Sequence, residues 1–200
     1  MEKAILYLHG QGGSAAEAAR FQPVCPGYAV LGVDYALDSP WRVTPVLRAA
    51  YAQAAEAYGS LTLLANSIGA FYAMHALGDC PLERALFISP ILDMEALIRQ
   101  MMERAGVSEE ALSRQGEVVT GDGETLSWDY LQYVRANPVR WPVPTRILYA
   151  AGDHLTARRT VDAFAAAHSA LVTVMPGGEH WFHTGEQLAF LDRWLRQALR

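Results

Sequence analysis

Short apolar runs alternate with longer segments of helical periodicity along this chain of 200 residues. Such alternation is typical of βα units, in which parallel strands lie between helices on both faces of a sheet. Most of the apolar runs show no polar alternation, as expected for strands that are buried on both sides. We expect six strands: Ala4–His9, Ala29–Asp34, Leu61–Asn66, Arg84–Ser89, Thr145–Ala150 and Leu171–Met175. The predicted fold class is therefore α/β, with a mostly parallel six-stranded sheet and helices on both faces.

The helices between these strands are predicted from their end signals and their periodicity. Thr44-Pro45 combines a capping residue with a first-turn proline, so the helix between the second and third strands is expected to begin there. A helix over Thr156–His168 fills the interval between the fifth and sixth strands. The last helix is expected over Glu186–Leu199, where leucines and Trp194 recur on one apolar stripe.

The interval between the fourth and fifth strands, residues 91–144, is much longer than the other connections. It is expected to hold helices over Met94–Ala105, from Ser108 and over Trp128–Arg135. Nine acidic residues and five arginines give it a net charge of −4, whereas the rest of the chain carries −1. Residues 1–90 and 145–200 are therefore predicted to form the core, and residues 91–144 a helical cap. Such an insert is either a group of solvent-exposed helices without a role in binding or, as we favour, a lid over a site at the carboxyl edge of the sheet.

Composition excludes several classes of protein. Hydrophobic residues make up 52% of the chain and charged residues 18%, which excludes a disordered segment or a coiled coil. The net charge is −5 and Lys3 is the only lysine, so a phosphate backbone would find no cluster of cations. A nucleic acid is therefore not expected as a partner.

Two further features concern location. Residues 57–78 contain no charge and are long enough to cross a bilayer, but Gly59, Asn66 and Gly69 favour a strand followed by a buried helix. Cys25 and Cys80 have no metal-binding or redox spacing, so reduced thiols are expected. No secretory signal pattern precedes the first strand. We expect no membrane span and a cytoplasmic location.

A serine directly follows the third expected strand, in Ala65-Asn66-Ser67-Ile68-Gly69, and a helical pattern begins at Ala70. A serine in a tight strand-to-helix turn presents its hydroxyl above the sheet in a strained conformation. The amide of Ile68 and the start of the helix can face a developing negative charge. This turn is a candidate for a nucleophile.

Three other segments end strands in a similar way. The first strand ends in His9-Gly10-Gln11-Gly12-Gly13, a glycine-rich loop that lacks the spacing of either common nucleotide-binding loop. Asp153 follows the fifth strand and His180 follows the sixth. Carboxyl ends of parallel strands share one edge of a sheet, so these residues are expected to lie near Ser67.

The loop, the serine turn and the order serine, acid, histidine together resemble the α/β-hydrolase superfamily, in particular compact serine esterases and lipases. Ala65 stands where the family motif G-x-S-x-G has its first glycine. The resemblance covers nearly the whole chain and implies Ser67 as nucleophile, His180 as general base and Asp153 as the acid that orients it. It also implies an oxyanion hole formed by the backbone amides of Gln11 and Ile68.

Some assignments stay open on the sequence alone. Asp93 follows the fourth strand and is an alternative acid, and His183 is an alternative base. No metal-binding cluster is expected, and the resemblance implies no cofactor. The candidate residues of the substrate pocket are His9, Gly10, Met101, Trp128, Tyr130 and Trp181.

The predicted function is that of a serine hydrolase that cleaves a small carboxylic ester, thioester or amide through an acyl-enzyme. A carboxylesterase is the first choice, because a small uncharged ester suits a compact apolar site beneath an acidic insert. The expected partner is a small acyl substrate, and the oligomeric state is left open. Two alternatives remain: a relative that keeps the triad but senses a ligand or binds a partner with little turnover, and an acyltransferase.

Overall fold

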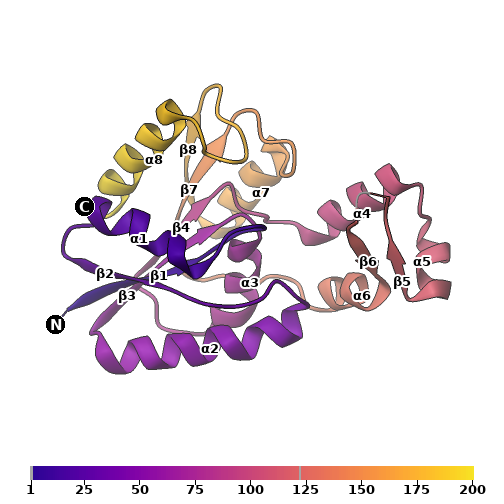
Figure 1. The fold of residues 1–200 in the computed structure, drawn as a ribbon, viewed down its shortest axis with the longest axis horizontal. Coiled ribbons are helices and arrows are strands. Elements are labelled where there is room, and N and C mark those ends of the chain that lie inside the picture. The colour runs from indigo at the N-terminus through magenta and orange to yellow at the C-terminus, as the bar shows by residue number, and fades with distance from the viewer. Residues whose placement is uncertain (1, 122) are drawn as a thin grey trace. The chain divides into compact units, whose positions relative to one another are not determined.

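Six parallel strands form the central sheet, in the order β2-β1-β3-β4-β7-β8 (Figure 1). The structure is a computed structural model, and it describes residues 2–121 and 123–200. The six expected strands are confirmed. Their bounds are β1 (Lys3–Leu8), β2 (Tyr28–Gly32), β3 (Ser60–Asn66), β4 (Arg84–Ile88), β7 (Thr145–Ala150) and β8 (Leu171–Met175).

Helices cover both faces of this sheet, as predicted. On one face lie α1 (Ala18–Phe21), flanked by the short 3-10 helices η1 (Ala15–Glu17) and η2 (Gln22–Val24), and the C-terminal helix α8 (Gly185–Ala198) (Figure 1). The opposite face is covered by α2 (Pro40–Ala57) and α3 (Ile68–Leu77), which pack against each other. Helix α7 (Arg158–His168) connects β7 to β8, and a right-handed crossover places it on the same face as α3.

The core beneath α1 and α8 shows why the strands are apolar throughout. Alternate residues of β1, β3, β4 and β7 point into it, and their neighbours on each strand pack against the other helical layer. Cys25 lies in this core, where burial raises the pKa of its thiol to about 11. Cys25 and Cys80 are both free.

The predicted start of α2 is wrong. The helix begins at Pro40, directly after Ser39, and Pro45 lies inside it. Ser39-Pro40 and Thr44-Pro45 carry the same local signal, and the earlier pair is the one that the fold uses. Pro45 supplies no N–H to the helical hydrogen bonds, and the helix nevertheless continues to Ala57.

Residues 57–78, the uncharged stretch, contain β3 and α3. Among the helices that the structure describes, none is both long enough and apolar enough to cross a membrane.

The chain folds into two compact units. The first comprises the described residues up to Leu92 together with Arg140–Arg200, and the second comprises Asp93–Val139. The second unit contains α4 (Met94–Ala105), α5 (Glu109–Gln115), a hairpin of β5 (Glu117–Val119) and β6 (Thr125–Ser127), and α6 (Trp128–Ala136). Helix α4 has the predicted bounds, whereas the hairpin was not predicted, because three-residue strands are too short to show a period. The role of residues 91–144 as a lid stays a prediction.

Ion pairs connect the helices of the second unit. The guanidinium of Arg135 in α6 donates to both carboxylate oxygens of Glu109 at 2.6 and 2.8 Å and to Glu95 at 2.9 Å. Arg99 also donates to Glu95, at 3.0 Å. These bonds, led by those from Arg135, lower the pKa of Glu95 and Glu109. One arginine thus joins α6 to α4 and α5.

Candidate active site

Ser67 occupies a strained turn between β3 and α3. Its φ of 53° and ψ of −122° lie in a region that residues with a side chain rarely adopt. Backbone bonds hold the turn: the N–H of Ser67 donates to the carbonyl of Ile88 at 2.9 Å, and the N–H of Ile91 donates to the carbonyl of Ser67 at 3.1 Å. The end of β4 therefore fixes the conformation of this serine.

The glycine that this turn requires is Gly69. A Cβ atom at that position would lie 2.7 Å from the carbonyl oxygen of His9 and 2.9 Å from that of Leu8, and both are backbone atoms. Ala65, where the family motif has its first glycine, is fully buried within β3 and carries its methyl group in regular strand geometry. The close approach of α3 to β1 thus depends on the second glycine of the motif.

Two hydrogen bonds link Ser67, His180 and Asp153. The Oγ of Ser67 lies 2.8 Å from Nε2 of His180, and Nδ1 of His180 lies 2.8 Å from Oδ2 of Asp153. The side chains of His180 and Asp153 are 1% and 0% exposed, and Ser67 as a residue is 8% exposed. The structure therefore brings together the three residues that the sequence singled out.

Asp153 determines which nitrogen of His180 carries the proton. The carboxylate accepts only, so the imidazole faces it with Nδ1–H and leaves the lone pair of Nε2 for the hydroxyl of Ser67. The other oxygen, Oδ1, accepts from the backbone N–H groups of Leu155 at 2.9 Å and Thr156 at 3.0 Å. Both oxygens are therefore held in place, and the arrangement can take the proton of Ser67.

Thr156 holds the loop of Asp153 in place, a contact that was not predicted from the sequence. Its Oγ1 donates to the carbonyl of Pro90 at 2.9 Å, and its own carbonyl accepts from the hydroxyl of Tyr149 at 3.0 Å. These bonds tie the loop of Asp153 to the segment after β4. The available signal was the spacing of Asp153 and Thr156, since an Asp often accepts from the backbone two and three residues later.

The loop after β1 packs directly on Ser67. A Cβ atom at Gly10 would lie 3.1 Å from Cβ of Ser67, so a side chain here would require the loop or Ser67 to shift by a few tenths of an ångström. His9 is 4% exposed, and its ring stacks on Tyr35 with centroids 4.3 Å apart. The hydroxyl of Tyr35 donates to the carbonyl of His9 at 2.6 Å. His9 and Gly10 thus define the position of the loop, and a contact of either with substrate stays a prediction.

The site lies where the strand order reverses. β1 and β3 are neighbours, but the chain leaves β1 towards α1 on one face and leaves β3 towards α3 on the other. The carboxyl ends of such strands border a crevice in open α/β sheets, and ligands bind there. Ile68 is the first residue of α3, so its N–H has no acceptor within the helix. An oxyanion hole formed by Ile68 and Gln11 stays a prediction.

The alternative acid and base have other contacts. The carboxylate of Asp93 caps α4, where it accepts from the N–H of Ala96 at 2.9 Å. The side chain of His183 is 57% exposed, and its Nδ1 lies 3.5 Å from a carboxylate oxygen of Glu179. Neither residue is needed to complete the hydrogen-bonded set of Ser67, His180 and Asp153.

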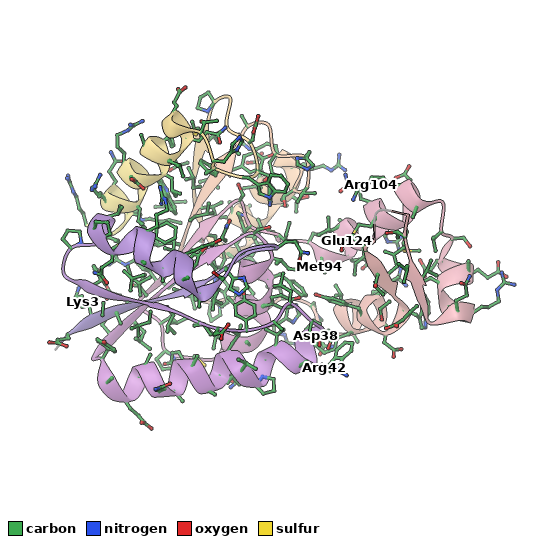
Figure 2. The ribbon with its side chains drawn as sticks, viewed as in Figure 1. Lys3, Asp38, Arg42, Met94, Arg104 and Glu124 are labelled. Atoms are coloured by element: carbon green, nitrogen blue, oxygen red, sulfur yellow. The ribbon has the colours of Figure 1, made fainter. Side chains whose placement is uncertain are left out.

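The remaining pocket candidates are distributed over both units. Trp181 follows His180 and is 68% exposed. Met101, Trp128 and Tyr130 belong to the second unit and are half-buried. Within that unit, Met101 lines a cavity of about 250 Å³ together with Arg104 and Glu124, which Figure 2 labels. A role of these residues in binding substrate stays a prediction.

Over residues 2–121 and 123–200, no group of three or more His, Cys, Asp or Glu side chains is arranged to hold a metal ion.

Comparisons with known proteins rest on structure alone, because no family profile and no curated protein matches the sequence. The chain is similar to Est1E from Butyrivibrio proteoclasticus, with a TM-score of 0.79 and 16% identity over 100% of this chain and 88% of the other. It is also similar to alpha/beta hydrolase domain-containing protein 10 from mouse, with a TM-score of 0.71 and 15% identity over 98% and 89% of the two chains. The thioesterase RedJ from Streptomyces coelicolor gives a TM-score of 0.65 and 16% identity over 98% and 85%.

Proposed function

Because the chain has the α/β-hydrolase fold, we propose that it is a serine hydrolase that cleaves a small carboxylic ester through an acyl-enzyme on Ser67. The observation that carries the proposal is the pair of 2.8 Å contacts from Ser67 to His180 and from His180 to Asp153. Similarity of fold alone would not suffice, since this fold serves many activities.

The reaction begins when the Oγ of Ser67 attacks the acyl carbon and Nε2 of His180 takes its proton. Asp153 stabilises the imidazolium that results, and it keeps the ring in place. The carbonyl oxygen becomes an oxyanion that accepts from the amides of Gln11 and Ile68, each worth about 3–4 kcal/mol in the transition state. His180 then returns the proton to the leaving alcohol.

Water completes the cycle by the same route. The oxygen of a water molecule attacks the acyl carbon while His180 takes one of the protons of that water. His180 then returns a proton to the Oγ of Ser67, and the carboxylic acid leaves. The near-complete burial of His180 and Asp153 favours this chemistry, because interactions between charged groups are stronger away from solvent.

Labelling with a fluorophosphonate probe, followed by peptide mass mapping, tests the proposal. We expect modification of Ser67, none in Ser67→Ala, and strongly reduced labelling in His180→Ala. The matched control is His183→Ala, which removes an exposed histidine three residues away and is expected to label normally. Labelling elsewhere, or none in the folded protein, would contradict the mechanism.

Substrate class is tested with p-nitrophenyl esters of increasing acyl length, with matching thioesters as a second series. A preference for short esters supports the carboxylesterase. Two results would replace it with one of the alternatives: only a few turnovers with every acyl donor would indicate a ligand-sensing or partner-binding protein, and product formed faster with an added alcohol than with water would indicate an acyltransferase.

A further inference from the structure

A buried tyrosine and a surface glutamate meet beside the loop of residues 9–13. Tyr7 in β1 is 1% exposed, and its hydroxyl donates to Oε2 of Glu17, the last residue of η1. The same carboxylate lies against the end of the loop, since a Cβ atom at Gly13 would lie 2.8 Å from Oε1 of Glu17. One side chain therefore contacts both the strand before the loop and the last residue of the loop.

A second contact extends this arrangement to the nucleophile. Asn66, at the end of the neighbouring strand β3, acts on the Tyr7 hydroxyl in the sense that lowers its pKa, and Asn66 immediately precedes Ser67. The carbonyl oxygen of Asn66 would lie 3.4 Å, and its side-chain nitrogen 3.6 Å, from a Cβ atom at Gly10. Glu17 thus lies beside Gly13, Asn66 lies beside Gly10, and Tyr7, which donates to Glu17, is on the strand next to that of Asn66.

The glycines of the loop carry no side chains that could hold it. Gly10, Gly12 and Gly13 carry no side chains, Gly12 has a φ of +73°, and Gln11 is exposed. Two internal contacts converge on the carbonyl of Gly10: the N–H of Gly13 donates to it at 3.1 Å, and Nδ1 of His9 lies 2.9 Å from it. Glycine loses more conformational freedom on ordering than any other residue, so a loop of this kind depends on contacts from outside.

External contacts act at both ends of the loop. Tyr35 holds the first end, where its hydroxyl donates to the carbonyl of His9. Glu17 and Tyr7 hold the other end. Burial, and then the Glu17 carboxylate, raise the pKa of Tyr7 well above its usual range, so the hydroxyl remains a donor. Packing does not require that hydroxyl, because a phenylalanine would fill the same space.

On this basis we propose that Glu17 and Tyr7 are positioning residues, which hold the loop against Ser67 so that the amide of Gln11 faces the developing oxyanion. The inference rests on the proposed function of Ser67. It predicts a specific kinetic effect, because a misplaced amide weakens binding of the transition state more than binding of the substrate.

The first test compares Tyr7→Phe, Glu17→Ala and Glu17→Gln in ester hydrolysis. For Tyr7→Phe and Glu17→Ala we expect kcat to fall about 10-fold or more, up to the ~10²–10³ loss that follows removal of an oxyanion donor, with KM changed less than about 2-fold. Glu17→Gln keeps an acceptor for the hydroxyl and is expected to retain most of the activity. In the double variant Tyr7→Phe/Glu17→Ala, kcat should fall no further than in either single variant, because both substitutions remove the same hydrogen bond.

The second test uses an alkyl trifluoromethyl ketone. The Oγ of Ser67 adds to its carbonyl carbon, the proton of Ser67 passes to His180, and the carbonyl oxygen becomes an oxyanion. Inhibition by this compound should weaken in Tyr7→Phe by about the same factor as kcat. The matched control is Tyr51→Phe, which removes a hydroxyl that donates to the carbonyl of Pro81 at 2.8 Å and should change neither value.

Hydrogen exchange is the third measurement, and together with activity it distinguishes a failure of the positioning role from a failure of the proposed hydrolase function. Hydrogen exchange at Gly12 and Gly13 should become faster in Tyr7→Phe while the melting temperature changes little. An active wild type together with unchanged kcat, inhibition and exchange in Tyr7→Phe would overturn the positioning role alone. A wild type that neither hydrolyses esters nor labels with fluorophosphonate would instead overturn the proposed function. A Tyr7→Phe variant with altered KM and unchanged kcat would also contradict the positioning role.

Discussion

Replacing Asp153 with asparagine tests whether the carboxylate sets the tautomer of His180, because the substitution hardly changes the shape of the side chain. In the native protein, Oδ1 accepts from two backbone N–H groups, of Leu155 at 2.9 Å and Thr156 at 3.0 Å, and Oδ2 accepts from His180. The two backbone donors should select the carbonyl oxygen of the new amide, which leaves its NH₂ group against Nδ1 of His180. Nδ1 must then accept, so the proton moves to Nε2, where it blocks transfer from Ser67.

The size of the effect follows from the alternative orientation of the amide. Turning the amide would restore the correct imidazole tautomer but would place NH₂ against the N–H groups of Leu155 and Thr156. Each unsatisfied buried donor is worth about 1–3 kcal/mol, so the turned form is disfavoured by about 2–6 kcal/mol. The corresponding loss in kcat/KM is roughly 30-fold to 10⁴-fold. Removal of the charge that stabilises the imidazolium adds to this loss.

The assay is hydrolysis of a p-nitrophenyl ester by Asp153→Asn, with the rate of fluorophosphonate labelling as a second readout. Asp93→Asn is the matched control, because asparagine caps a helix about as well as aspartate and α4 should be unaffected. A value of kcat/KM within about 3-fold of the wild type for Asp153→Asn would show that catalysis does not depend on the tautomer that Asp153 imposes on His180. Loss of activity in Asp93→Asn instead would identify Asp93 as the acid.

The other predictions concern stability. Gly69→Ala places a Cβ atom 2.7 Å from the carbonyl oxygen of His9, so we expect the free energy of unfolding to fall by about 1–3 kcal/mol, measured by urea denaturation. If the variant is as stable as the wild type, α3 does not require glycine there. Glu95 and Glu109 have a pKa below the ordinary value of 4.5, so their ion pairs with Arg135 stabilise fully above that pH and are lost as the pH falls through the lowered values. Hydrogen-exchange protection of the second unit, corrected for intrinsic rates, should therefore decrease in acid. Arg135→Met should remove most of this pH dependence. If the variant keeps the pH dependence of the wild type, the ion pairs of Arg135 are not its cause.

Local patterns predicted most of the secondary structure. The central strands β1, β3, β4 and β7 are buried on both faces, which requires an uninterrupted apolar run, and such a run is visible without knowledge of its neighbours. The predicted bounds of α4 agree with the structure, where Asp93 caps its first turn and Gly106 follows its last residue, so both end signals are adjacent to the helix in sequence. The predicted start of α2 was wrong because the sequence contains two Ser/Thr-Pro pairs with the same local signal, and only packing distinguishes them.

Contacts between segments that are distant in sequence could not be predicted from local sequence patterns. The bond from Thr156 to Pro90 joins residues 66 positions apart, and the bond from Tyr7 to Glu17 joins a strand to a 3-10 helix. No residue type or spacing in the sequence marks these pairs. They depend on how the loops at the carboxyl edge pack after the sheet has formed.

The apolar runs in the sequence were enough to predict that Ser67, Asp153 and His180 each follow a strand, and parallel strands bring such residues to one edge. Which acid reaches His180 depends instead on contacts between strands that are distant in sequence. Strands β7 and β8 are neighbours, with Ala150 opposite Met175, and this pairing brings the loops of Asp153 and His180 to a 2.8 Å contact. The pairing depends on the packing of the whole sheet, because a strand that is apolar on both faces carries no local information about its neighbour.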